Sequence, residues 1–395
     1  MNWEQVPDHW ESKKLSEIGE IYSGGTPDRD NPNYFGGDIP WLRLKDAKQF
    51  YVSTSDEKIT QEGLENSSAQ LLPEGSVIVS TRATIGEVTI AKRQVTTNQG
   101  FKAVYPQKAD SEFVAYFLSS ITDELENLGR TTTYPEVNKT QFSNIEIPLP
   151  SISEQRAIVK KLNSIFEKLN ESNETQSHAE DIARKVLNSA IKRLIDSAYK
   201  SSEQVKVEDV CDKIKNGGTP KRSNESYWGG NIPWLKSGEL KNSILYDSEE
   251  YMTEKGLSES SAKMFSPDTV LVAMYGATRG ETGFIKKEMS TNQAVCGLSA
   301  DESLCEPKYL WYCLRTLQSK LASQGRGGGQ DNINQTTIRN TIIPLPSIQR
   351  QRKIIERIEL VEERANEIRD ASNRIGEILD ILPKAVFNKA FSGNL

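Results

Sequence analysis

The chain repeats itself along its length, and this repeat constrains the fold more than any other feature. Three motifs occur in the same order in both halves: Gly-Gly-Thr-Pro at residues 24–27 and 217–220, an Ile-Pro-Trp-Leu segment at 39–42 and 232–235, and Ile-Pro-Leu-Pro-Ser-Ile at 147–152 and 343–348. The offset grows from 193 to 196, as small loop insertions would produce. Solenoid repeats have periods of about 20 to 50 residues, so the pattern predicts a tandem duplication of a whole domain.

Each copy begins with a strand-rich part. Short runs of Val, Ile and Thr, such as residues 76–80 and 269–273, lie between clusters of Gly, Pro and Asn. Such runs predict strands and turns. Residues 113–125 and 307–321 have apolar residues at helical spacing, so we expect an α+β fold in each copy.

A helical pattern follows each Ile-Pro-Leu-Pro-Ser-Ile motif. Ten positions spaced alternately by four and three residues match between the copies at an offset of 196, first Ile158, Leu162, Ile165, Leu169, Ser172, Gln176, Ala179, Ala183, Val186 and Ala190, then Ile354, Ile358, Val361, Ala365, Ile368, Ser372, Ile375, Leu379, Leu382 and Val386. This spacing predicts a coiled-coil seam. The partner of each helix is either the other copy or a second chain in a homodimer, and Pro383 should kink or end the second helix near Leu382.

Composition restricts the function without fixing it. Acidic residues outnumber basic ones, 55 to 49, and the pI is about 5.4, which argues against a protein that coats nucleic acid by bulk charge. A sequence-specific reader with cations on one face stays open. The sequence offers neither a signal peptide nor an apolar stretch of membrane-spanning length, so we expect a soluble, cytoplasmic protein without a membrane partner. The four cysteines lack CxxC spacing and are expected to be reduced, mostly buried thiols.

No motif indicates catalysis. Asn-Pro-Asn-Tyr at residues 31–34 departs from the Asn-Pro-Pro-Tyr element of adenine methyltransferases, and a solvated turn is the better interpretation. The glycine-rich residues 325–329 lack the Gly-Lys-Ser/Thr ending of a P-loop. With two histidines and no Cys/His ligand set, we predict no catalytic residue, metal site or cofactor.

Taken together, these motifs resemble those of the specificity subunits of type I restriction-modification enzymes. The resemblance rests on the duplicated motifs above, on Thr-Asn-Gln at residues 97–99 and 291–293, and on Ala-Phe-Ser-Gly at residues 390–393. It implies two target-recognition domains, each reading one part of a bipartite double-stranded DNA target and separated by two long antiparallel coiled-coil helices with pseudo-twofold symmetry. It also implies that two methyltransferase subunits bind the helices and that restriction or translocase subunits join some complexes.

The resemblance divides the chain into four predicted segments. These are a first target-recognition domain at residues 1–153, a central helix at 154–199, a second target-recognition domain at 200–349 and a C-terminal helix at 350–395. Two other functions stay open, a DNA methyltransferase or nuclease with unrecognised motifs and a structural coiled-coil adaptor. The non-catalytic specificity subunit is the main hypothesis.

The duplication itself separates scaffold from candidate DNA-reading residues. Positions identical in both halves serve what the halves share, whereas unlike loops could specify two different half-sites. Groups suited to base edges and phosphates occur in the unlike loops at Arg43, Lys45, Arg82, Thr84, Arg130, Tyr134, Lys139, Lys236, Tyr275, Arg279, Arg326, Gln330 and Asn332. The sharpest difference lies between residues 130–136 and 326–332, which we predict to discriminate the half-sites.

Overall fold

The computed structural model describes residues 6–130, 135–324 and 332–395. The chain forms two compact units. The first unit consists of Met1–Gln176 with Arg374–Leu395, and the second of Ser177–Asn373. Within the described ranges, no helix has an apolar stretch that could cross a membrane.

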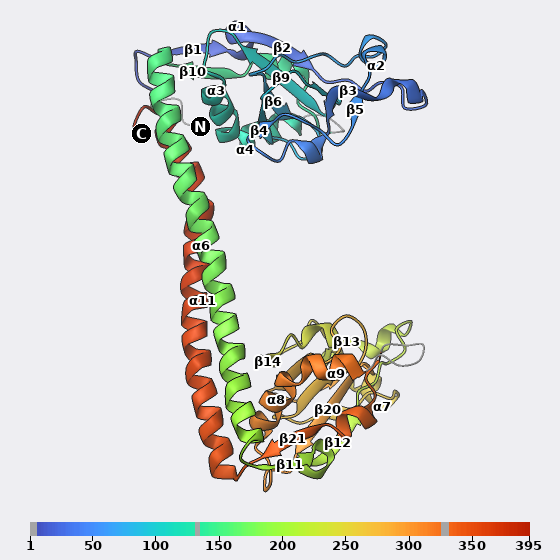
Figure 1. The fold of residues 1–395 in the computed structure, drawn as a ribbon. Coiled ribbons are helices and arrows are strands. Elements are labelled where there is room, and N and C mark those ends of the chain that lie inside the picture. The colour runs from blue at the N-terminus through green and yellow to red at the C-terminus, as the bar shows by residue number, and fades with distance from the viewer. Residues whose placement is uncertain (1–5, 131–134, 325–331) are drawn as a thin grey trace. The chain divides into compact units, whose positions relative to one another are not determined.

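A five-stranded sheet lies at the centre of the first unit (Figure 1). Its strand order is β2 (Gly19–Ser23), β9 (Phe101–Pro106), β6 (Val77–Ser80), β7 (Val88–Ala91) and β4 (Tyr51–Val52). A smaller sheet has the order β5 (Lys58–Ile59), β3 (Phe35–Leu42) and β8 (Thr96–Thr97), and a further pair joins β1 (Glu11–Lys14) to β10 (Glu146–Leu149). The short helices are α1 (Leu15–Ile18), α2 (Gln61–Glu65), α3 (Ser111–Ser120), α4 (Thr122–Gly129) and α5 (Lys139–Ser143).

Both faces of this sheet are buried because its strands are apolar on both sides. Val77, Val79 and Val104 pack with α3 on one face. Ile78 and Ala103 pack toward β3 and β8 on the other. This layering explains the continuous apolar run of β6, which does not alternate as a half-exposed strand would.

The second unit repeats the same order of elements. Its sheets are β12 (Cys211–Asn216), β20 (Val295–Ala300), β17 (Val270–Ala273), β18 (Thr282–Ile285) and β14 (Ser243–Leu245), then β15 (Glu250–Met252), β13 (Trp228–Leu235), β19 (Met289–Thr291) and β16 (Met264–Phe265), then β11 (Glu203–Lys206) and β21 (Ile342–Leu345). Its short helices are α7 (Glu254–Ser258), α8 (Pro307–Thr316), α9 (Gln318–Gln324) and α10 (Gln335–Arg339). The predicted α+β class is confirmed, although each helix expected near 113–125 and 307–321 is two helices, α3 with α4 and α8 with α9.

Two long helices, α6 (Ile152–Tyr199) and α11 (Ile348–Phe391), confirm the helical pattern. In the first unit, Ile158 and Leu162 at the start of α6 share a core with Ala390 and Phe391 at the end of α11. In the second unit, the end of α6 shares a core with the start of α11. The two helical segments in each unit therefore run antiparallel.

The helix contact departs from the predicted seam in its central part. Val186, Ile368 and Ile375 are 54%, 45% and 47% exposed. Ala183 and Ser372, two other predicted positions, stay inside at 5% and 3% exposed, and a Cβ at Gly376 would sit 3.1 Å from Nε2 of Gln176. A strict 3.5-residue repeat drifts by about 20° per heptad around a straight α-helix, so Val186, Ile368 and Ile375 fall outside the contact while other predicted positions stay in it.

Helix α11 continues through Pro383 to Phe391, so of the two predicted effects of this proline, a kink or an end, the end near Leu382 does not occur. Proline inside a helix removes one hydrogen bond and costs about 3 kcal/mol. The turns after Pro383 offset this cost by burial, because Ala390 and Phe391 lie in the core of the first unit. The aromatic ring of Phe391 lies 5.4 Å from those of both Phe113 and Phe117.

Candidate nucleic-acid interface

In the first unit, backbone hydrogen bonds join three loops at one edge of the central sheet. The amide of Asn98 donates to the carbonyl of Leu42 at 2.9 Å, at the end of β3. The amide of Thr81, just beyond β6, donates to the carbonyl of Gly100 at 2.7 Å. The loops after β3 and after β6 therefore lie on either side of residues 97–100.

The loop that differs most between the repeats is tied to this same edge. The amide of Val137 donates to the carbonyl of Thr81 at 3.1 Å. Glu136, which precedes Val137, and Arg82, which follows Thr81, form an isolated antiparallel β-bridge. Glu136 and Val137 thus lie against the turn that carries Arg82.

The second unit reproduces these connections. Asn292 donates to Leu235 at 2.9 Å, Met274 donates to the carbonyl of Ala294 at 2.7 Å, and Ile333 donates to that of Met274 at 2.9 Å. The backbone frame of the edge is therefore common to both units. The side chains of its outer turns, which follow β6 in the first unit and β17 in the second, differ. This is the arrangement expected of one scaffold that displays two different sets of contacts.

Three charged side chains form a cluster on the edge of the first unit. Nη2 of Arg82 lies 2.5 Å from Oε2 of Glu136, and Nζ of Lys102 lies 3.4 Å from Oε1 of the same carboxylate. Burial lowers the pKa of Lys102, and Glu136 offsets part of that shift. Burial raises the pKa of Glu136, but the hydrogen bond from Arg82 and the charge of Lys102 outweigh it, so the net shift is downward. The cluster holds its carboxylate ionised.

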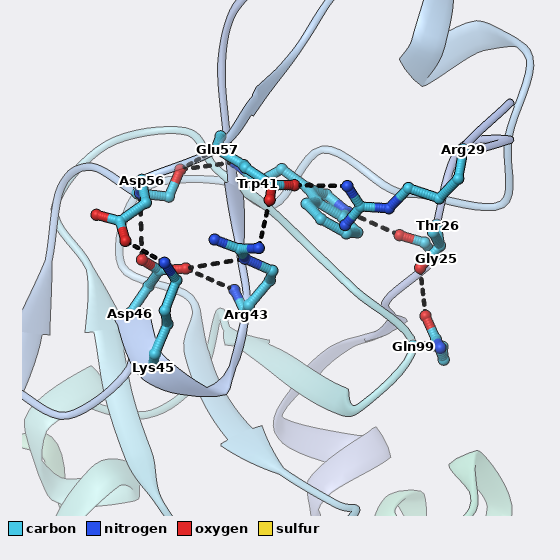
Figure 2. A network of polar contacts seen from close by, with 11 residues as sticks. Gly25, Thr26, Arg29, Trp41, Arg43, Lys45, Asp46, Asp56, Glu57 and Gln99 are labelled. Atoms are coloured by element: carbon cyan, nitrogen blue, oxygen red, sulfur yellow. Dashed lines mark hydrogen bonds and ion pairs between the residues drawn. The ribbon is translucent and has the colours of Figure 1, made fainter. Parts of the chain in front are cut away.

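Arg43 and Lys45 of the predicted set lie in a second polar network (Figure 2). Arg43 pairs with Glu57 and Lys45 pairs with Asp56. Both cations follow β3 and so flank residues 97–100. The Lys45–Asp56 pair is exposed, and exposed pairs contribute about 0 to 1 kcal/mol to stability, whereas the Arg43–Glu57 pair is half-buried.

Lys236 occupies the position in the second unit that Arg43 occupies in the first. Its Nζ lies 2.9 Å from Glu249 and 3.2 Å from Glu250, the counterparts of Asp56 and Glu57. Lys236 alone therefore contacts two carboxylates. Their counterparts in the first unit pair with two different cations, Arg43 and Lys45. Arg43 and Lys236, chosen as residues of unlike loops, have equivalent surroundings.

The remaining predicted residues are less closely grouped. The exposed ones are Thr84 and Tyr275 in the outer turns, Arg130 at the end of α4 and Lys139 at the start of α5. Arg279 and Asn332 are half-buried, and both are engaged in interactions. Tyr134, Arg326 and Gln330 lie outside the described residues, as do most of the two loops predicted to discriminate half-sites.

An arginine that the sequence interpretation missed braces each smaller sheet. Cζ of Arg29 lies 4.8 Å from the ring centroid of Phe35. It lies 4.7 Å from that of Trp41, and Nη1 of Arg29 lies 2.8 Å from Glu57 (Figure 2). The counterpart Arg222 makes the same contacts in the second unit. Arg29 and Arg222 are identical residues at aligned positions, and this identity is the sequence signal that could have indicated their role.

Residues identical in both repeats support the backbone of the edge. Thr26 hydrogen-bonds Gln99, and Nε1 of Trp41 donates to the carbonyl of Gly25 at 2.9 Å (Figure 2). Their counterparts do the same, Thr219 with Gln293 and Trp234 with Gly218. This agrees with the scaffold role predicted from their identity.

The Asn-Pro-Asn-Tyr segment has a structural role, while the glycine-rich residues 325–329 lie outside the described residues. The side chain of Asn31 accepts from the amide of Asn33 and caps the 3-10 turn Pro32–Tyr34, and Asn224 does the same in the second unit. The four cysteines are free, and burial raises the pKa of Cys296 and Cys305 to about 12, which leaves them unreactive thiols. Within the described ranges, no group of three or more His, Cys, Asp or Glu side chains is placed to hold a metal ion.

Comparison with known proteins identifies the family. The model of the type I restriction modification DNA specificity domain matches twice, at residues 7–180 and 199–378. The chain belongs to this family. The specificity subunit of the type I restriction enzyme MjaIX from Methanocaldococcus jannaschii is 28% identical, and the alignment covers 98% of this chain and 94% of that subunit.

Solved structures share the fold along the whole chain. A chain from work on complex assembly and conformational transition of the type I R-M system superposes with a TM-score of 0.77 at 20% identity, covering 99% of each chain. The HsdS subunit from Thermoanaerobacter tengcongensis gives 0.60 at 20% identity, covering 99% of this chain and 98% of that one. The predicted family is confirmed, and with it the prediction of a specificity subunit instead of a free-standing methyltransferase or nuclease.

Proposed function

We propose that the chain binds double-stranded DNA and that each half reads one part of a bipartite target. The outer turns and the loops tied to them make the base contacts in each half. The four segments predicted from the sequence, with boundaries at residues 153, 199 and 349, are the functional divisions of this proposal. A DNA ligand also implies a cytoplasmic location.

The observation that carries the proposal is the pairing of one backbone frame with unlike side chains. Thr81 and Met274 occupy equivalent positions and accept equivalent hydrogen bonds, from Val137 and Ile333. The side chains next to them change in size and charge between the halves. Two different half-sites require such a difference, because the major groove presents a distinct pattern of donors and acceptors for each base pair.

The proposed DNA-binding residues are those predicted from the sequence. Ion pairing does not remove them from the set, because exposed pairs are weak and a phosphate or base edge can replace the carboxylate partner. In the first unit they are Arg43, Lys45, Arg82, Thr84, Arg130, Tyr134 and Lys139. In the second unit they are Lys236, Tyr275, Arg279, Arg326, Gln330 and Asn332.

Methyltransferase subunits are the proposed partners of the long helices. These helices expose apolar side chains that a protein without a partner would be expected to bury. They are Ile182, Val186, Leu360 and Ile368 in the second unit and Ile375, Ile378 and Ile381 in the first. Rows of this kind on a helix suit a protein partner. Two methyltransferase subunits, one for each set, fit the duplication, and restriction or translocase subunits would join the assembled complex.

The docking assignment is tested by charge substitution. Ile378→Asp with Ile381→Asp in the first unit, and Ile182→Asp with Val186→Asp in the second, should each reduce co-purification of a methyltransferase subunit. The unfolding midpoint should stay unchanged because the replaced side chains are exposed. Undiminished co-purification with both pairs of changes would place the partner elsewhere.

DNA binding is tested with the purified full chain and two duplexes, one of random sequence and one carrying the methylated motif of the source strain. Preference for the motif duplex, with an affinity that falls as salt rises, is expected. The absence of binding to either duplex would favour a structural coiled-coil adaptor. Methyl transfer or cleavage by the lone chain would favour the enzymatic alternative.

A further inference from the structure

The charged cluster on the edge of the first unit is not repeated at the aligned positions of the second. The positions of Arg82, Glu136 and Lys102 are held there by uncharged residues: Tyr275, Asn332 and Cys296. The backbone hydrogen bonds around both sets are equivalent, so the difference lies in the side chains alone. The three charges are therefore specific to the first unit, whereas the backbone hydrogen bonds from Val137 and Ile333 are common to both.

The three side chains of the cluster differ in their access to a ligand. The side chain of Arg82 is 46% exposed, that of Glu136 is 26% exposed, and that of Lys102 is 7% exposed. Lys102 therefore lies beneath the carboxylate, and Arg82 lies at its outer side. Each oxygen of Glu136 meets a different cation, Oε1 facing Lys102 and Oε2 facing Arg82.

This arrangement suits one class of base pair. In the major groove an arginine donates to O6 and N7 of guanine, and a glutamate accepts from the amino group of the paired cytosine. Arg82 and Glu136 are joined by a hydrogen bond and an antiparallel bridge, so one would meet each base of a single G·C pair. An arginine on a phosphate would need no carboxylate beside it.

We infer that Arg82 and Glu136 together read one G·C base pair in the half-site recognised by the first unit, with Lys102 as the buried residue that positions Glu136. The inference rests on the proposed function and adds the base pair and the residues that read it. When Arg82 turns toward guanine, Glu136 loses its ion pair with Arg82. Lys102 then keeps Glu136 ionised and in place, since a partly buried carboxylate without a cation beside it is destabilised. The second unit, with Tyr275 and Asn332 at these positions, reads a different pair.

The experiment measures the affinity of the full chain for duplexes in which each base pair of the methylated motif is replaced in turn. Wild-type chain should lose about 10- to 100-fold in affinity when the critical G·C pair is replaced. Arg82→Gln and Glu136→Gln should each remove most of that discrimination while leaving the other positions of the motif as selective as before. Lys102→Met should weaken the discrimination at this same G·C pair without a change in the salt dependence of binding.

A matched surface pair provides the control. Arg184 lies 2.5 Å from Asp181 on α6, and Arg184→Gln should leave every position of the motif unaffected. Equal loss of affinity on all duplexes after Arg82→Gln would show a phosphate contact and overturn the inference. Reduced thermal stability with unchanged base discrimination would show a structural clasp and overturn it as well.

The proposed function fails in a different way. A wild-type chain that does not distinguish the motif duplex from random sequence contradicts sequence-specific binding itself. A wild-type chain that reads both half-sites, but neither of them through Arg82 and Glu136, leaves the proposed function in place and removes only this inference.

Discussion

The ring of Tyr116 on α3 lies stacked on the ring of Phe166 on α6, with centroids 5.5 Å apart and an angle of 9° between their planes. Tyr312 holds the equivalent position on α8, yet its hydroxyl donates to Oε2 of Glu362 on α11 at 2.8 Å. Arg315 meets the same carboxylate at 3.4 Å. The contact between globular part and helix is therefore aromatic in the first unit and ionic in the second.

This difference predicts opposite responses to salt. Glu362→Gln should destabilise the second unit by about 2 kcal/mol, the cost of hydrogen bonds to a charged group, and the cost should shrink at high salt. Phe166→Leu should cost the first unit about 1 kcal/mol at any salt concentration, as an apolar exchange does. Hydrogen exchange of the α3 and α8 peptides reports the two contacts separately. A salt-independent effect of Glu362→Gln would contradict the ionic description.

Pro383 offers a direct test of how α11 is held. Because the helix continues through the proline, Pro383→Ala should restore a backbone hydrogen bond and stabilise the first unit by about 1 to 3 kcal/mol in denaturant unfolding. Ala385→Gly, at an exposed position two residues on, should destabilise it by about 1 kcal/mol. A loss of stability on Pro383→Ala would mean that the proline fits a local bend.

Glu250 should make the second unit sensitive to acid. The hydrogen bond from Arg222 lowers its pKa below the ordinary value of 4.5, with a further contribution from Lys236. A carboxyl whose pKa falls on folding adds stability that is present above its unfolded-state pKa and is lost as the pH falls through the lower folded-state value. Glu250→Gln should therefore reduce the difference between urea midpoints measured at about pH 6 and about pH 4. An unchanged difference would assign the acid sensitivity to other carboxylates.

The repeat and the switch from strand to helix spacing predicted the two matching units and both long helices, because periodicity survives when individual residues change. Val186 and Ile368 of the predicted seam are exposed because a strict 3.5-residue repeat drifts around a straight helix, whereas the predicted positions Ala183 and Ser372 are buried. Arg29 was missed because residues identical in both halves were assigned to the scaffold as a class. The cluster of Arg82, Glu136 and Lys102 could not be predicted, because the three residues come from separate parts of the chain and only the fold brings them together.

The central claim is that each half of the chain reads its own part of the target through its outer loops. It is tested most directly by replacing residues 130–136 with residues 326–332 and determining the methylated motif of the genome in cells that carry the complete complex. The account predicts a bipartite motif in which one half-site is altered or lost and the other is unchanged. An active complex that methylates the original motif in both halves would contradict it.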